Sequence, residues 1–546
     1  MSVTPTYPGI YIQELPSTSH SVTAAPTAVT VFVGYTNPFW LAAPEATPPP
    51  FGQATEVQSF AEYAALFGGF FSCPWLTDYV GHAVYQFFLN GGSDAYIVGI
   101  ETKAVEAPTA SLMASGTTGA GGTGGSTGTG FTFTALQPTG TPASGSTPAQ
   151  GMPMTVALSN VITTAASDDT ADVTIVYGTT VETYRRLPIT SLVSTINSQS
   201  QLANVAASGS PTSYSGLPTQ QTPFTYATAP TSGTTVFKES DFTAVFAANG
   251  SLDKVAIFNL MVLPGVSDAT VLAAALSFSE GKKAFLIMDP PVNGVADTLA
   301  AELPGVPSGA APIATIWNGG DTSTPAPPVS PNGAIYFPYL QFSDPVTGDA
   351  TTSPPSGFVA GIFAAEDSNR GVWKSPAGLE TTITGTTGVV PWGVMTDQQQ
   401  GVLNPLGINA IRTFPGIGSV VFGARTLVAD NPAFQQWEYV AVRRMALFIE
   451  QSLQTSLRWA VFEPNATPLW NALTQEISAF LLGLFRQGAF AGTTADQAFQ
   501  VQCDATTTSP TDIANGIVNV LVSFAPLSPA EFVVIKISQL AGQSQS

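Results

Sequence analysis

The sequence is poor in the residues that carry most enzyme chemistry. Its 546 residues include two cysteines and two histidines. Cys73 and Cys503 are too few for a disulfide framework, and each is typical of a small buried apolar side chain. His20 and His82 stand alone, and no HExxH, paired CxxC or P-loop pattern is present. These absences argue against zinc hydrolysis, thiol redox chemistry and nucleotide hydrolysis.

Charged residues are scarce as well. They make up 10% of the chain, where soluble domains usually have about 25%, and the formal net charge is −20. A negative protein repels a phosphate backbone, so we expect no nucleic-acid partner. No apolar run approaches the ~18 residues of a membrane span, and residues 1–5 lack the basic and apolar regions of a secretory signal. We therefore predict no membrane partner and folding in the cytoplasm.

Apolar residues, in contrast, are plentiful. They form 44% of the chain, and its length suffices for roughly three to four domains with real cores. The charge is uneven: residues 361–546 carry 13 acidic and nine basic side chains, including seven of the nine arginines, while residues 1–360 carry 23 acidic and seven basic ones. This division suits a subunit with an inward contact surface and an outward solvated one.

Two short patterns in the glycine-rich tract imitate catalytic motifs. Residues 124–128 match the esterase elbow GxSxG, and residues 119–124 match GxGxxG. Neither follows a predicted strand or begins a helix, so both result from composition. A cluster of Asp168, Asp169 and Asp172 could ligate a metal, but a solvated turn is the more ordinary interpretation. We predict no catalytic residue, no cofactor and no metal site.

Periodicity and turn signals predict an α/β core in two pieces, 26–105 and 236–365. The core elements alternate between short apolar strands and helices that end at glycine or asparagine. The spacing of the second piece suggests a right-handed strand–helix–strand crossover. The predicted strands are 29–33, 96–100, 255–263 and 284–288, and the predicted helices are 59–67, 79–89 and 271–280, the last closed at Gly281.

Between the two pieces lies a stretch of different composition, 106–235. Residues 107–167 and 187–237 contain no charged side chain and are rich in Thr, Ser, Gly, Ala and Pro. A pure linker is one interpretation. The alternating runs 172–177 and 180–185, turned at Gly178, instead indicate a folded β-rich domain, followed by a weak helical period over 191–206.

The C-terminal third contains the two clearest helical patterns, within a predicted domain 366–525. Apolar residues recur at helical spacing over 434–459 and over 467–486, the latter with Thr467 as the predicted N-cap and Pro468 after it. Arg443 and Arg444 lie in the first helix, and Arg486 lies in the last turn of the second. Solvated helix-face charges are the default interpretation of these arginines, and contact with a partner is the alternative.

Both ends of the chain are predicted to be extended arms, 1–25 and 526–546, with a frayed terminus as the alternative for 1–25. A Tyr-Pro-Gly turn precedes a short β run near the N-terminus, and another β run follows the last helical unit. Such terminal strands are available to a neighbouring subunit. The candidate arm contacts are Tyr7, Pro8, Gly9, Ile10, Tyr11, Ile12, Glu531, Phe532, Val533, Val534, Ile535, Lys536 and Ile537.

Several segments, taken in order, closely resemble contractile tail sheath proteins of myophages, R-type pyocins and extracellular injection systems. The resemblance covers most of the chain outside 106–235 and is strongest between 412 and 540. The segments that carry it are 7–12, 60–67, 83–96, 335–338, 354–357, 371–377, 425–427, 459–465, 468–470, 503–504 and 529–537.

The resemblance implies a discontinuous α/β core, an inserted outer domain, an inner C-terminal domain and two arms that pair with neighbouring subunits. The implied partners are copies of the chain itself, an inner tail tube protein, and baseplate and tail terminator proteins. Arg443, Arg444 and Arg486 become candidate tube contacts. The implied location is a virion tail or a released injection particle, assembled in the cytoplasm.

Two functions from different classes therefore compete. The first is a force-transmitting sheath subunit, which polymerises because a head-to-tail contact that does not close generates a helix. The second is a surface-display protein whose inserted β domain recognises a receptor or glycan. The extended termini and the resemblance favour the sheath.

Overall fold

The structure is a computed structural model that describes residues 21–38, 50–71, 76–101, 108–114, 129–136, 153–163, 169–225, 237–290, 330–345, 348–390, 395–532 and 534–535. The chain divides into two compact units. One is Pro26–Arg444, and the other combines Met1–Ala25 with Met445–Ser546. Among the helices in the described ranges, none has the length and apolar character that a membrane span requires.

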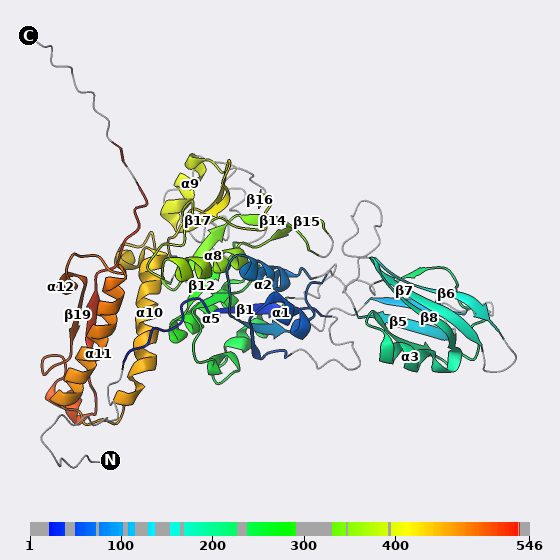
Figure 1. Cartoon of the computed structure of the whole chain (residues 1–546), viewed down its shortest axis with the longest axis horizontal. Helices are drawn as coiled ribbons and strands as arrows, with labels where there is room; N and C mark the ends of the chain where they lie inside the picture. The colour runs from blue at the N-terminus through cyan, green and yellow to red at the C-terminus, as the bar shows by residue number, and fades with distance from the viewer. Residues whose placement is uncertain are drawn as a thin grey trace, which may run out of the picture. The chain divides into compact units, whose positions relative to one another are not determined.

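The larger unit is built on an eight-stranded sheet (Figure 1). Neighbouring strands from β17 to β3 run parallel, and the two outermost pairs are antiparallel. The central strands are buried along their length, which explains their continuous apolar sequences. In spatial order the strands are β18 (Gly418–Val421), β17 (Ile408–Phe414), β13 (Gly333–Phe337), β12 (Phe285–Met288), β11 (Leu260–Val262), β1 (Thr30–Tyr35), β3 (Ala95–Ile100) and β2 (Ala54–Val57).

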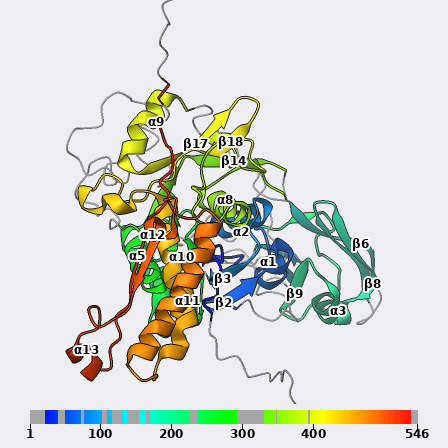
Figure 2. The same ribbon diagram turned by 60° about the vertical axis from the view of Figure 1, so that its left-hand side comes forward.

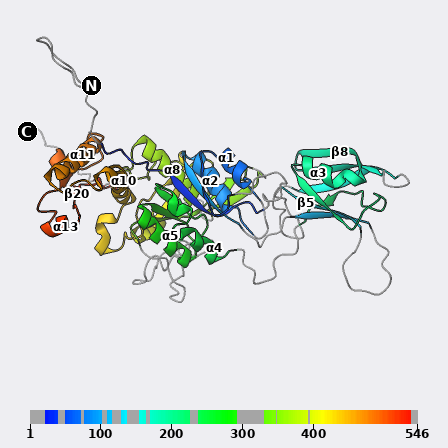
Figure 3. The same cartoon turned by 90° about the horizontal axis from the view of Figure 1, so that it is seen from below.

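Helices cover both faces of this sheet (Figure 3). On one face lie α2 (Tyr79–Leu89) and α8 (Ser356–Asn369), and the ring of Phe32 on β1 meets Phe87 of α2 at 5.4 Å. On the other face α5 (Ala269–Lys282) shares a core with the alternate β1 residues. Helices α2 and α8 cross closely because Gly357 faces Ala83, where an added Cβ would lie 2.5 Å from the alanine Cα.

Most predicted elements of this unit are confirmed. Helix α1 (Phe60–Phe67) is capped by Ser59 and ended by Gly68 at φ 83°, and α2 has its predicted bounds. The crossover β11–α5–β12 joins parallel strands as expected. The predicted end of α5 is wrong, because the helix continues through Gly281 and Lys283 adopts the left-handed conformation at φ 60°. The strand predicted over 255–263 shortens to β11.

Smaller elements complete the core. A second antiparallel sheet has the order β15–β14–β16. These strands are β15 (Ala350–Ser353), β14 (Tyr339–Ser343) and β16 (Gly388–Val390), and the short helices are α4 (Glu239–Thr243) and α9 (Asp397–Leu403). The predicted domain boundary between 365 and 366 falls inside α8.

Part of the stretch 106–235 folds around its own core. The core gathers apolar side chains from two sheets and from α3 (Leu192–Gln199). The helix expected over 191–206 is wrong beyond Gln199, because Ser200 is extended and a strand begins at Ala203. The sheets are β10 (Thr222–Pro223), β6 (Met154–Ile162), β7 (Thr170–Tyr177) and β8 (Thr180–Pro188), and β4 (Thr109–Met113), β5 (Gly130–Ala135) and β9 (Ala203–Ser208).

The C-terminal elements centre on two helices that lie side by side, α10 (Val440–Ser456) and α11 (Thr467–Arg486) (Figure 2). The rings of Phe448 and Phe480 join them at 6.1 Å. The smaller elements are α12 (Ala495–Ala498), β19 (Phe499–Gln502), α13 (Pro510–Ala514) and β20 (Leu521–Phe524). The N-cap of α11 is Ala466, one residue before the predicted Thr467.

The first of these helices begins later than predicted. Residues Pro432–Trp437 form a 3-10 turn, and Phe434 departs from helical geometry at φ −121°. Helix α10 starts at Val440 because the preceding backbone is bound elsewhere: Thr426 donates its N–H to the carbonyl of Glu438, and Val440 donates to the carbonyl of Ala424. Long-range hydrogen bonds thus override a helical pattern.

Candidate functional site

A two-stranded sheet in the C-terminal unit is the first candidate contact. Strands β19 and β20 pair antiparallel, from Phe499 opposite Phe524 to Gln502 opposite Leu521. Within the described ranges no further strand joins this sheet. Leu521 is 56% exposed. The sheet is stabilised by packing against α11 and Phe490. A strand at the edge of a sheet presents backbone groups that a further strand can pair with.

The segment after β20 supplies exposed apolar side chains without a sheet of its own. Phe532, Val534 and Ile535 are 74%, 79% and 79% exposed, and none of them lies in a strand. Exposed apolar side chains in sequence mark an interaction segment. Of the other predicted contacts at this end, Glu531 is described, whereas Val533, Lys536 and Ile537 lie outside the described residues, as do all predicted contacts at 7–12.

The described start of the chain is fastened along α10. Thr23 donates its N–H to the Ser456 hydroxyl at 3.0 Å, and Ala25 donates to the Ser452 hydroxyl at 2.9 Å. Farther along, the side chain of Asn259 donates to the carbonyl of Pro26 at 2.8 Å. The root of the predicted N-terminal arm therefore has defined attachments.

One edge of the inserted sheets, at β9, is partly covered by side chains. The Asn197 side chain of α3 donates to the carbonyl of Val205 on β9 at 3.0 Å and accepts its N–H at 2.7 Å. Glu182 on β8 accepts hydrogen bonds from the hydroxyl of Ser200 and the N–H of Gln201. Side chains thus occupy backbone groups on β9 that an incoming strand would need.

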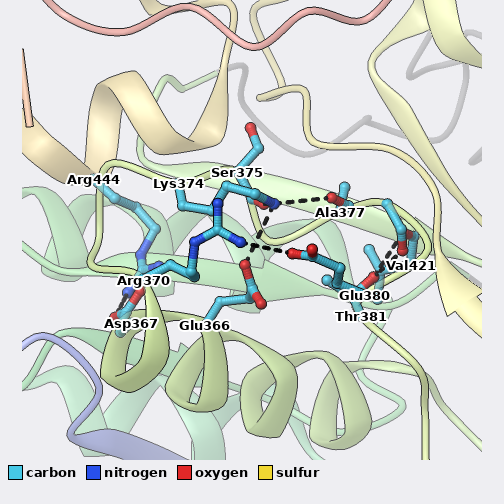
Figure 4. A network of polar contacts seen from close by, with 11 residues as sticks. Glu366, Asp367, Arg370, Lys374, Ser375, Ala377, Glu380, Thr381, Val421 and Arg444 are labelled. Carbon is cyan, nitrogen blue, oxygen red and sulfur yellow. Dashed lines mark hydrogen bonds and ion pairs between the residues drawn. The ribbon is translucent and has the colours of Figure 1, made fainter. Parts of the chain in front are cut away.

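Among the three predicted tube contacts, Arg444 differs most clearly from its prediction. It is 3% exposed and grips Asp367 with two nitrogens, at 2.9 and 2.5 Å (Figure 4). It also donates to the carbonyl of Thr27 and lies over the ring of Phe363. Burial raises the pKa of Asp367, and the guanidinium opposes that shift. Arg444 therefore holds the core together, and its predicted role at a tube is wrong because its guanidinium is buried.

The other two arginines have different surroundings. The Nε of Arg443 donates to the side chain of Asn332 at 2.8 Å, and its guanidinium lies over Trp437 at 4.8 Å. Arg486 is exposed in the last turn of α11. Only Arg486 presents its charge fully to solvent, so the tube contact that remains proposed centres on it.

A network at the end of α8 uses further basic side chains (Figure 4). Lys374 lies 3.4 Å from Glu366 and donates to the carbonyl of Ser375 at 2.9 Å, and Arg370 pairs with Glu380 at 2.9 Å. These pairs were not predicted from the sequence. The four-residue spacing of Glu366 and Arg370 was the available signal, but it does not reveal the actual partners.

Buried carboxylates elsewhere act as structural acceptors. Asp289 accepts from the backbone N–H and hydroxyl of Ser356, and Asp78 accepts from the N–H groups of Phe71 and Gly81. Burial raises the pKa of both to about 6. Within the described ranges, no three His, Cys, Asp or Glu side chains are grouped to hold a metal. The local geometry is that of helix caps.

Comparison with known proteins identifies the family. The phage tail sheath protein central domain matches residues 246–427, and the phage tail sheath C-terminal domain matches residues 433–539. Together these matches cover just over half of the chain. The chain belongs to the contractile tail sheath protein family.

Individual relatives agree with this assignment. A prophage major tail sheath protein of Pseudomonas aeruginosa (strain UCBPP-PA14) is 29% identical over 197 residues, which are 36% of this chain and 48% of the relative. The tail sheath protein of Vibrio phage KVP40 is 27% identical over 154 residues, which are 28% of this chain and 21% of the relative. The matches thus span less than half the length of these curated relatives.

Solved structures show the same fold over nearly the whole chain. A chain of the anti-feeding prophage helical sheath in its contracted state has a TM-score of 0.56 and 22% identity, covering 98% of this chain and 100% of its own. A chain of the PVC sheath complex, an extracellular contractile injection system, has a TM-score of 0.53 and 22% identity, covering 98% and 99%. The predicted α/β multidomain class is confirmed.

Proposed function

We propose that this chain is the structural subunit of a contractile tail sheath, which polymerises helically around an inner tube and contracts to drive the tube through a target cell envelope. The observation that carries the proposal is membership of the tail sheath family. Fold similarity over 98% of the chain to a contracted sheath supports it.

Strand exchange between copies is the proposed linkage. The β19–β20 sheet has two strands, and the exposed segment with Phe532, Val534 and Ile535 has the apolar side chains that an added strand could bury. The N-terminal arm is proposed to act in the same way. Backbone hydrogen bonds would then connect subunits without broad packed faces, and the faces could repack while the strands stay paired.

The geometry of such an array implies the other partners. A head-to-tail contact that does not close has two free ends. We therefore include a baseplate protein and a tail terminator protein at the ends and a tube protein inside, with Arg486 as its candidate contact. The particle would be a virion tail or a released injection system. Its extended state would be kinetically trapped, so contraction needs no nucleotide and no catalytic residue.

Truncation after Pro526 tests the linkage. The shortened chain should fold and stay monomeric, because the deleted segment makes its contacts in another copy. Negative-stain electron microscopy and sedimentation would show tubes from the parent and none from the truncated protein. A matched control, L379S, changes an exposed leucine in the other unit and should form normal tubes. Tubes from the truncated chain, or its failure to fold, would contradict the proposed linkage.

A further inference from the structure

The loop before α11 displays an aromatic side chain that no described residue covers. Phe462 is 101% exposed and the preceding Val461 is 63% exposed. The backbone of Phe462 has φ +72°, a conformation that residues other than glycine and asparagine rarely adopt. The exposed phenyl ring and the disfavoured backbone conformation each raise the free energy of the folded chain. This combination points to a contact with another molecule.

The base of this loop is held firmly. Asn465 accepts a hydrogen bond from the indole of Trp470 and donates to the carbonyl of Ile517, each at 2.9 Å. Trp470 belongs to a buried cluster with Leu469, Leu473 and Cys503. Phe462 is therefore presented on a preorganised support, and a rigid aromatic anchor of this kind is typical of binding hot spots.

The same support connects the loop to the small sheet. Ile517, whose carbonyl Asn465 binds, is 45% exposed, and four residues later β20 begins at the exposed Leu521. Ile513, on α13 just before this segment, is also exposed. Exposed apolar side chains thus continue from the loop toward the strand-accepting sheet.

We propose that Val461 and Phe462 form a docking knob, which inserts into an apolar seat on a second copy of this chain. The inference rests on the proposed strand exchange, because that contact places a neighbouring copy against β20, and the loop is bonded to the segment entering β20. The nearest charges in the loop region, Arg458 and Glu463, are of opposite sign, so the contact chemistry is apolar. The exchanged strand alone would connect the neighbouring copy loosely, and the knob fixes the position of that copy.

The test replaces Phe462 by glycine in the full chain. Glycine accepts φ +72° without strain, so F462G should leave thermal unfolding of the monomer unchanged or raise its midpoint. The critical concentration for polymerisation of sheath alone, without tube, should rise by about tenfold or more, which is the effect of losing one good anchor. The rise should persist in high salt, since an apolar contact is not screened.

The control is V181S on β8 of the inserted domain, which removes another exposed apolar side chain, 56% exposed. V181S should polymerise like the parent. Unchanged sheath-only polymerisation of F462G would overturn the proposal, and a defect of F462G only in co-assembly with tube would make the tube the partner. If the parent and V181S also form no polymer, the proposed sheath function fails and the knob with it. Parent tubes alongside normal F462G tubes would refute the knob alone.

Discussion

At the scale of single residues, burial decides what a charge can do. Arg444 and Arg486 have the same kind of side chain. Arg444 is paired with Asp367 inside the core, whereas Arg486 faces solvent. A buried charge left without its partner is costly, whereas an exposed charge contributes little to folding.

Removing the buried guanidinium should destabilise the protein strongly. R444A would leave Asp367 buried and unpaired, so we expect a loss of about 3–5 kcal/mol in the free energy of unfolding. R486A, the matched exposed arginine, should change it by about 0.5 kcal/mol or less. Denaturant unfolding of both variants checks this. Equal stabilities would mean that the Asp367–Arg444 pair does not stabilise the core.

The two buried aspartates give a pH dependence with a definite sign. The pKa of Asp78 and of Asp289 is about 6 in the folded chain, against about 3.9 in the unfolded one. The folded state holds these protons more tightly, so their stabilising contribution is present at low pH and is lost as pH rises from about 4 to 6. Each accounts for about 3 kcal/mol at most.

D289N removes one of these titrations. The fall in unfolding free energy between pH 4 and 6 should become shallower in D289N, whatever its absolute stability, because one fewer proton is released. D512N is the control, since hydrogen bonds lower the pKa of Asp512 and its effect falls below this window. Denaturant unfolding at several pH values measures how the unfolding free energy changes with pH. If this change is the same in D289N and the parent, Asp289 does not contribute to the pH dependence.

At the scale of elements, the proposed contact with the tube protein can be tested at the end of α11. Arg486 lies in the last turn, where the helix dipole favours a cation, and its charge is exposed. R486E should weaken co-assembly with the tube protein at low salt, and the difference should shrink as salt screens the contact.

Sheath-only polymers of R486E should still form, because β19–β20 and the arms are unchanged. The matched control is R185E, which reverses an exposed arginine on β8 of the inserted domain. Co-sedimentation with tube across a salt series distinguishes the two variants. If R486E sheathes tubes as well as R185E at every salt concentration, the tube surface lies elsewhere.

At the scale of the whole molecule, the inserted domain should be dispensable for assembly. It has its own core, and Asn197 occupies the backbone of Val205 at a sheet edge. Replacing 106–235 by a short Gly/Ser linker should therefore spare polymerisation, as long surface segments tolerate change. Electron microscopy of the shortened chain tests this. A folded core that no longer forms tubes would show that the insertion carries subunit contacts.

Family, fold class and many local elements could be predicted because their signals lie in neighbouring residues. Ser59 and Gly68 delimit α1 through one hydrogen bond and one left-handed residue, and Gly178 turns the β7–β8 hairpin as expected. Continuous apolar runs indicated strands buried on both faces. These features depend on residues only a few positions apart, so they can be predicted from the sequence.

The tertiary structure decided whatever depends on distant partners. Arg444 meets Asp367 across 77 positions and Thr27 across 417, so spacing along α10 could not show that it is buried. The start of α10 was likewise set by hydrogen bonds from other segments, and Ser200, which follows α3, is bonded to Glu182 on β8. Sequence alone thus determined the family and the local elements, whereas long-range packing decided which charges and sheet edges remain available to another subunit.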